Sequence, residues 1–324
     1  MSARPARGPD ELFAAARAGD RAATGRLLSL VERGGEAGRR VAALTFGPSA
    51  GVNHVLGITG APGAGKSTLT DRLIAAARSD GGKVGVLAID PSSPFSGGAI
   101  LGDRVRMQRH ALDEGVFIRS MATRGHQGGL ALAVPEAVRV LAAVGMGRVF
   151  VETVGVGQVE VDVAGAADTT LVVVTPGWGD AVQASKAGLL EVADLFVVNK
   201  ADREGAAETR RDLEQMLDLN PAAASWRPPV LLATAATGEG VDDLWAAVVE
   251  HRAHLERSGE LGRRRDRRLV DELDRILRTL LEGEVRRLEH GRRFDAVKAE
   301  MLARRLDPYE AAARLRSGPS PAGG

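Results

Sequence analysis

The chain has 324 residues, of which 44% are apolar, with 43 Lys+Arg against 42 Asp+Glu. This composition is globular, and the length predicts about two domains or one large domain with appendages. The formal net charge of +1 argues against bulk binding of a polyanion, so no nucleic-acid partner is expected. Cysteine is absent, which excludes disulfides and thiolate metal sites and fits the reducing cytoplasm.

The N-terminus carries no apolar stretch typical of a signal peptide, and no apolar run approaches the length of a membrane span. We therefore expect a cytoplasmic protein without a membrane partner. Glycine is frequent, at 40 residues, whereas Phe, Trp and Tyr together are scarce. Many glycines with few aromatic residues suggest loops that bring the backbone close to a ligand.

Residues 10–46 show apolar positions at helical spacing, with a break at Gly19 and Asp20. From residue 55 to about residue 250, short β-rich runs alternate with helical stretches. This alternation predicts a doubly wound, mostly parallel α/β sheet. The expected strands are residues 55–59, 84–89, 116–120, 149–153, 170–175, 195–198 and 230–233.

No strand pattern follows His251. Leucines and other apolar residues from Leu269 to Leu288 form a narrow stripe on a charged helix, and the tail from Arg316 onward is expected to be disordered.

A glycine-rich loop directly follows the first expected strand and matches the pattern G-x-x-x-x-G-K-[ST] without deviation. Such loops turn successive N–H groups around a phosphate, and the helix that follows presents its positive N-terminus. Lys66 would reach the β- and γ-phosphates, and Ser67 would ligate Mg²⁺. The expected nucleotide-binding residues are Gly60, Ala61, Pro62, Gly63, Ala64, Gly65, Lys66, Ser67 and Thr68.

The strand at residues 195–198 ends in Asn199, Lys200 and Asp202, the N-K-x-D arrangement of GTPases. The Asp202 carboxylate can accept hydrogen bonds from guanine N1–H and N2–H₂ together, whereas adenine would leave it unpaired. After the strand at residues 230–233, Thr234, Ala235 and Ala236 stand where GTPases carry a Ser-Ala turn facing guanine O6. The sequence therefore predicts GTP and GDP as ligands.

Carboxylates at the ends of two further strands are candidate Mg²⁺ ligands, because strand ends of a doubly wound sheet converge on the ligand edge. Asp90 ends one strand, and Asp103 follows it on a loop. Glu152 ends another strand, in the place of the Walker-B carboxylate, and also counts as a catalytic candidate with Lys66. The Gly155 amide that follows is the natural sensor of the γ-phosphate.

Taken together, these segments closely resemble the MeaB/ArgK family of mutase-associated P-loop GTPases, over about residues 10–315. The resemblance implies a GTPase chaperone that gates adenosylcobalamin loading and protects or reactivates an acyl-CoA mutase of the methylmalonyl-CoA mutase type. The matching strings are TGAPGAGKSTL, AIDPSSPFSGGAILGDRVRM, FIRSMATRGHQGGL, VETVGVGQVEVDVAGAADTTLVVV, PGWGDAVQASKAGLLEVADLFVVNKAD and ATAATGEGV.

The resemblance also implies roles and boundaries. It makes the segment matching residues 180–186 a switch that responds to the mutase, with Gln183 and Lys186 as its active members. It implies a homodimer through the C-terminal helices, which fits the leucine stripe. The expected organisation is an N-terminal helical extension (1–48), a P-loop GTPase domain (49–250), a C-terminal helical dimerisation arm (251–315) and a disordered tail (316–324).

Three other functions remain as alternatives. A nickel-type metal-insertion GTPase should show clustered Cys or His, but Cys is absent, and His251 and His254 are expected to be solvated. A second alternative is a nucleotide-locked scaffold that never hydrolyses GTP. The third, a nucleic-acid factor built on residues 263–268, is disfavoured because that arginine run lacks aromatic residues and reads as a solvated helix face.

Overall fold

The computed structural model describes residues 7–47, 54–90, 107–110, 112–122, 129–153, 165–177, 191–219 and 225–317. The chain divides into two compact units, Met1–Arg268 and Leu269–Gly324. The first unit holds the sheet, and the second consists of helices. In the described part of the chain, no helix has the length and apolar character needed to cross a membrane.

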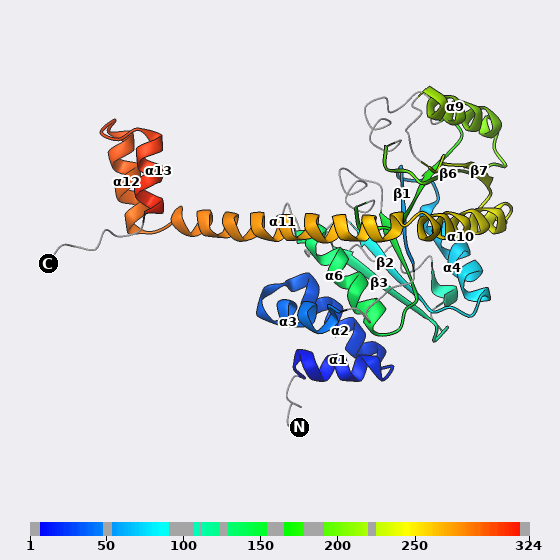
Figure 1. The fold of residues 1–324 in the computed structure, drawn as a ribbon, viewed down its shortest axis with the longest axis horizontal. Coiled ribbons are helices and arrows are strands. Elements are labelled where there is room, and N and C mark those ends of the chain that lie inside the picture. The colour runs from blue at the N-terminus through cyan, green and yellow to red at the C-terminus, as the bar shows by residue number, and fades with distance from the viewer. Residues whose placement is uncertain are drawn as a thin grey trace. The chain divides into compact units, whose positions relative to one another are not determined.

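A seven-stranded sheet forms the centre of the first unit, in the order β3-β2-β4-β1-β5-β6-β7 (Figure 1). Every strand pairing is parallel, so the doubly wound sheet predicted from the sequence is confirmed. The strands are β1 (His54–Gly60), β2 (Val84–Asp90), β3 (Val116–Ala122), β4 (Arg148–Thr153), β5 (Thr169–Val174), β6 (Leu195–Asn199) and β7 (Val230–Ala233).

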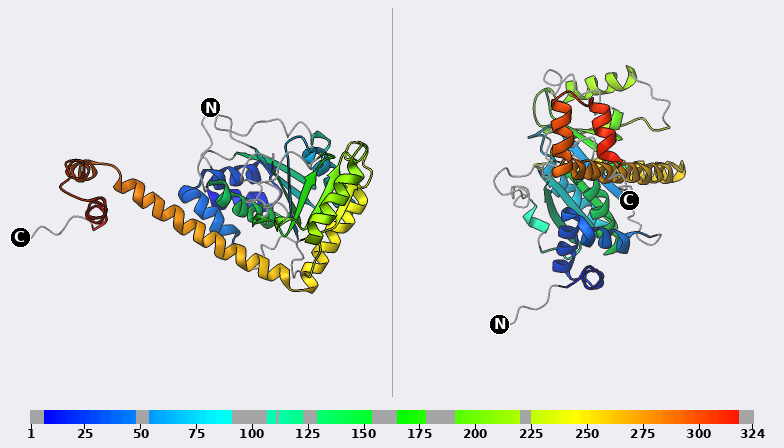
Figure 2. Two further views of the ribbon diagram at one scale, coloured as in Figure 1. Left: turned by 90° about the horizontal axis from the view of Figure 1, so that it is seen from above. Right: turned by 90° about the vertical axis from the view of Figure 1, so that its left-hand side faces the viewer.

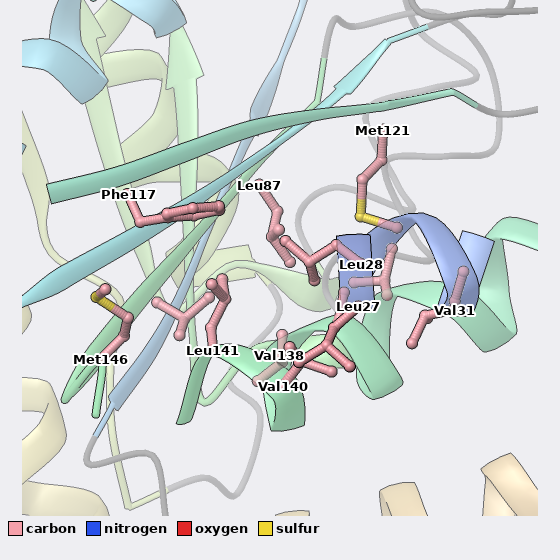
Figure 3. Packing of buried hydrophobic residues seen from close by; sticks show 14 of the residues in the cluster. Leu27, Leu28, Val31, Leu87, Phe117, Met121, Val138, Val140, Leu141 and Met146 are labelled. Atoms are coloured by element: carbon pink, nitrogen blue, oxygen red, sulfur yellow. The ribbon is translucent and has the colours of Figure 1, made fainter. Parts of the chain in front are cut away.

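Helices cover both faces of the sheet, which explains why its strands are almost continuously apolar. One face packs against α4 (Lys66–Ser79) and α10 (Val241–Arg257), and β4 contributes Phe150 to that layer. The other face packs against α6 (Gly129–Ala143) and receives Val149 and Val151 of the same strand. Figure 3 shows this second layer, where Leu27 and Leu28 meet leucine and valine side chains of α6.

Of the three N-terminal helices, α2 (Arg21–Arg33) and α3 (Gly35–Thr45) pack against α6, and α1 (Pro9–Arg17) packs on α2 and α3 (Figure 2). The predicted break between α1 and α2 is present, and the Asp20 carboxylate caps α2 by accepting from Ala23 N–H. A second break at Gly34, with φ of 65°, was missed by the helical spacing. Glycine adopts this left-handed backbone at little cost, and this lets α3 fold back along α2.

Helix α9 (Ala206–Leu219) packs on β6 and β7, and α11 (Glu260–Leu288), α12 (Arg292–Leu302) and α13 (Pro308–Arg316) follow α10. Among the described residues after His251 no strand occurs, as the sequence predicts.

The central position of β1 determines where a ligand can bind. From β1 the chain runs outward through β2 on one side and crosses to β5 on the other. A crevice forms at the carboxyl end of such a switch point, and doubly wound proteins bind their ligands there. The loop after β1 lies at this end of the sheet.

Candidate functional site

The loop after β1 wraps on itself and leads into α4, which begins at Lys66. The buried Lys66 ammonium donates to the carbonyl oxygens of Gly60 and Ala61, at 2.8 and 2.9 Å. A further hydrogen bond closes the turn, from Ala64 N–H to Ala61 O at 3.2 Å. The loop therefore has the enclosing shape that a phosphate needs, with a cation and a helix N-terminus aimed at its centre.

Two glycines of this loop are required by close contacts. At Gly60, with φ of 139°, an added Cβ would lie 2.0 Å from the Val173 carbonyl oxygen of β5. At Gly65, with φ of 90°, it would lie 2.3 Å from the Asn199 amide nitrogen. Both positions combine a positive φ with no room for a side chain, so the motif glycines follow from the packing of the loop against β5 and β6.

Ser67 and Glu152 meet at the carboxyl ends of β1 and β4. The Ser67 hydroxyl donates to the Glu152 carboxylate at 2.6 Å, and both side chains are buried. Beside them, the hydroxyls of Thr59 and Thr153 lie 3.1 Å apart and link the same two strands. A hydroxyl and a carboxylate oxygen are hard donors of the kind that Mg²⁺ takes, so this pair fits a magnesium site.

Asn199, at the end of β6, joins the phosphate loop to the loop after β7. Its amide nitrogen donates to Ala64 O at 2.8 Å, and its amide oxygen accepts from Ala235 N–H at 3.0 Å. The next residue, Lys200, has φ of 60° and donates to Gly63 O at 2.8 Å. The last residue of β6 and the residue that follows it thus hold the phosphate loop from its side.

The remaining base candidates lie at the same edge. Asp202 is exposed just beyond Lys200, where its carboxylate is open to a ligand. Thr234 and Ala235 are buried and Ala236 is exposed, so Ala236 is the accessible residue of these three. Thr68 is exposed on the first turn of α4.

Several predicted site residues lie outside the described part of the chain. These are Asp103, Gly155, Gln183 and Lys186. Asp90 ends β2 and pairs in register with Ala122 of β3, which places its backbone at the ligand edge.

Two polar residues of α4 near this site were not singled out from the sequence. The Arg72 guanidinium donates to Ala235 O at 3.1 Å and to Ala236 O at 2.7 Å. The buried Asp71 carboxylate pairs with Arg109 and lies 3.2 Å from His110 Nε2, next to η1 (Gln108–His110). Burial, with the nearby Arg109 charge, lowers the pKa of His110. No local motif marks either residue, because both partners are distant in sequence.

The arginine run at the start of α11 is only in part the solvated face that the sequence predicts: Arg263 and Arg267 are exposed, but the other arginines of the run pair with buried carboxylates. Arg265 and Arg268 pair with the fully buried Asp168, and Arg264 donates to Asp194 at 2.9 Å. These contacts lie at the amino ends of β5 and β6, opposite the phosphate loop.

The expectation for His251 was also wrong. It is fully buried, and its Nδ1 lies 2.8 Å from Thr169 Oγ1. The Thr169 hydroxyl also lies 2.8 Å from His54 Nε2, so β1, β5 and α10 share one buried polar chain.

Comparisons with known proteins agree with this geometry. Residues 24–289 match the family described as Methylmalonyl Co-A mutase-associated GTPase MeaB. A Pyrococcus abyssi protein described as a GTPase is 50% identical over 306 residues, which is 94% of each chain. GTPase ArgK of Escherichia coli is 40% identical over 69% of each chain. The crystal structure of a LAO/AO transport system kinase matches with a TM-score of 0.70 at 28% identity, covering 98% of this chain and 99% of that one.

Proposed function

Because the chain belongs to the family of methylmalonyl-CoA mutase-associated GTPases, we propose that it is a GTP-hydrolysing chaperone of an adenosylcobalamin-dependent acyl-CoA mutase. It gates the loading of adenosylcobalamin and protects or reactivates the mutase. The observation that carries the nucleotide part of the proposal is Asn199, whose amide joins the phosphate loop to the loop after β7. The mutase part rests on family membership.

The phosphate end of the site is built from the loop at residues 60–68. In this proposal the loop amides surround the β-phosphate, and Lys66 donates to the β- and γ-phosphates in place of its present carbonyl partners. Ser67 and Glu152 hold Mg²⁺, with Asp90 and Asp103 as further ligands. Bound Mg²⁺ neutralises charge that builds up on the phosphates during transfer. The Gly155 amide senses the γ-phosphate.

The base end is built from β6 and the loop after β7. Asp202 accepts from guanine N1–H and N2–H₂, and the turn at Thr234, Ala235 and Ala236 donates a backbone N–H to O6. The exposed carboxylate beyond Lys200 supports this role, because a buried and paired one could not receive a base. A site that hydrogen-bonds a polar edge rejects the analogue that leaves its groups unpaired.

Coupling to the partner is assigned to Gln183 and Lys186. We propose that the mutase positions this pair beside the nucleotide, which adds the stabilisation of the transition state that the isolated chain lacks. Supplying such a group is worth about 10³–10⁵ in rate in other GTPases. The exposed stripe on α11 joins two copies in a cytoplasmic homodimer, and neither nucleic acid nor a membrane is a partner.

Two measurements with a purified adenosylcobalamin-dependent mutase test the proposal. GTP turnover should rise when the mutase is added, and Lys186→Ala should lose most of that rise. The control is Lys83→Ala, an exposed lysine before β2, which should keep the full rise. In parallel, transfer of adenosylcobalamin to the apo-mutase should differ between GTP and a non-hydrolysable analogue. A chain that neither responds to the mutase nor changes its cofactor loading would contradict the chaperone role.

A further inference from the structure

Arg72 lies on α4, little more than one helical turn after Ser67, and faces the loop after β7. Its Nε donates to Ala235 O at 3.1 Å and its Nη2 donates to Ala236 O at 2.7 Å. These carbonyls are 163 and 164 residues away in sequence. A planar guanidinium that spans two successive carbonyls fixes their direction more firmly than a single point charge can.

The loop that Arg72 grips is held from its other side as well. Asn199 Oδ1 accepts from Ala235 N–H, and Thr234 N–H donates to Glu239 O at 2.9 Å. At Gly240, with φ of 74°, an added Cβ would lie 2.2 Å from Leu232 O. The end of the turn is therefore packed closely against the backbone of β7. Arg72 therefore links the phosphate-loop helix by hydrogen bonds to a turn that the Asn199 amide also holds.

Because each peptide unit is planar, the hydrogen bonds from Arg72 to these carbonyls also affect the N–H groups that could recognise a base. The carbonyl of Ala235 and the N–H of Ala236 belong to one planar unit and point in opposite directions. Fixing the carbonyl with a cation therefore fixes where that N–H points, and a hydrogen bond on one side of a peptide strengthens the donor on the other. Ala236 is exposed, so its N–H is accessible from outside the turn.

We propose that Arg72 is a positioning residue for guanine recognition, which aims the N–H of the Ala235–Ala236 peptide unit at guanine O6; the next N–H, of Thr237, already donates to Thr234 O at 3.1 Å. This inference rests on the proposed guanine site and adds to it a specificity determinant on the phosphate-loop helix. Arg72 acts through the backbone and does not touch the base.

The test compares GDP with 6-thio-GDP, which keeps N1–H and the 2-amino group but replaces O6 with sulfur, a weaker acceptor. The wild-type chain should prefer GDP, and Arg72→Ala should lower its affinity for GDP about tenfold and bring the ratio of the two affinities close to one. Arg72→Lys keeps the positive charge but replaces the planar guanidinium with a single ammonium group, and it should give an intermediate ratio.

Arg78→Ala is the matched control, because Arg78 also lies on α4 and also makes several hydrogen bonds, to Asp113 and Gly82 O. It should lower stability while keeping the wild-type ratio. An Arg72→Ala chain with the wild-type ratio overturns the proposal, even if it binds both nucleotides more weakly. If that variant does not fold, an unchanged ratio in Arg72→Lys overturns it. If the wild-type chain binds ADP as tightly as GDP, the proposed guanine site itself is contradicted.

Discussion

Lys66 is the residue on which the phosphate site most depends. Its buried ammonium donates to two carbonyl oxygens of its own loop. The loop backbone is also supported by other hydrogen bonds, which remain when the lysine side chain is removed. We expect Lys66→Ala to fold while its affinity for GTP falls about hundredfold, because two charge-assisted hydrogen bonds to phosphate are lost. Titration with a fluorescent GTP analogue measures the loss, and thermal unfolding checks the fold. Unchanged affinity in a folded variant would contradict the site.

His54 makes stability depend on pH. Burial lowers its pKa to about 3, whereas an unperturbed histidine has a value of about 6.5. Between these pH values the unfolded chain binds a proton that the folded chain does not. The free energy of unfolding should therefore decrease as the pH falls below about 6.5, by about 1.4 kcal/mol per pH unit from this residue.

Urea unfolding of wild type and His54→Gln at several pH values between 7.5 and 5 measures this contribution. The glutamine amide keeps a polar group near Thr169 but does not titrate, so its stability should change less steeply with pH. His290→Gln is the control, since His290 is exposed. Identical slopes for wild type and His54→Gln would show that His54 binds a proton equally well in the folded and the unfolded chain.

At the scale of elements, the inner strands of the sheet were predictable because they are buried on both faces and each reads as a short apolar run between polar turns. The phosphate loop was predictable because all its functional residues are contiguous. Arg72 and the pairing of Arg265 with Asp168 were not predictable, since their partners lie 163 and 97 residues away. The local sequence shows that an arginine run is charged. Whether its side chains contact water or a buried carboxylate depends on the tertiary fold.

Asp168 connects several elements at the end of the sheet opposite the phosphate loop. It accepts from Val55 N–H of β1 and pairs with Arg252 of α10 and Arg265 and Arg268 of α11. Burial alone would raise its pKa, but the hydrogen bond from Arg265 and the charge of Arg268 outweigh burial and lower that pKa well below the ordinary range.

Asp168→Ala should therefore lower the free energy of unfolding by about 3–5 kcal/mol, because it removes a fully buried carboxylate and leaves three partly buried arginines and a strand N–H without their partner. The comparison is Asp274→Ala, which breaks an exposed pair with Arg278 and should cost less than about 1 kcal/mol. Urea unfolding at pH 7 measures both. Equal losses in the two variants would show that the Asp168 cluster adds no more than a surface ion pair.

For the whole molecule, the feature that predicts an assembly is the exposed apolar stripe on α11. Leu269, Leu273, Leu277 and Leu280 are all exposed. Large apolar side chains in a continuous row are costly to leave in water, and such patches mark interaction sites. The first turns of the same helix belong to the first unit, because Arg264 and Arg268 pair there with carboxylates at the amino ends of β6 and β5.

Changing Leu273 and Leu280 together to Asp tests whether the stripe joins two copies of the chain. Two carboxylates on an apolar seam would be buried without partners in a dimer, which is strongly unfavourable, whereas in an isolated chain they would meet water. We expect light scattering to report monomers and GTP binding to persist, because the nucleotide site is built entirely from the first unit. Arg286→Asp is the matched control: it also changes the net charge by two units, but lies on the opposite face of the helix and should keep the dimer. A wild-type mass equal to that of the double variant would show that the stripe does not hold two copies together.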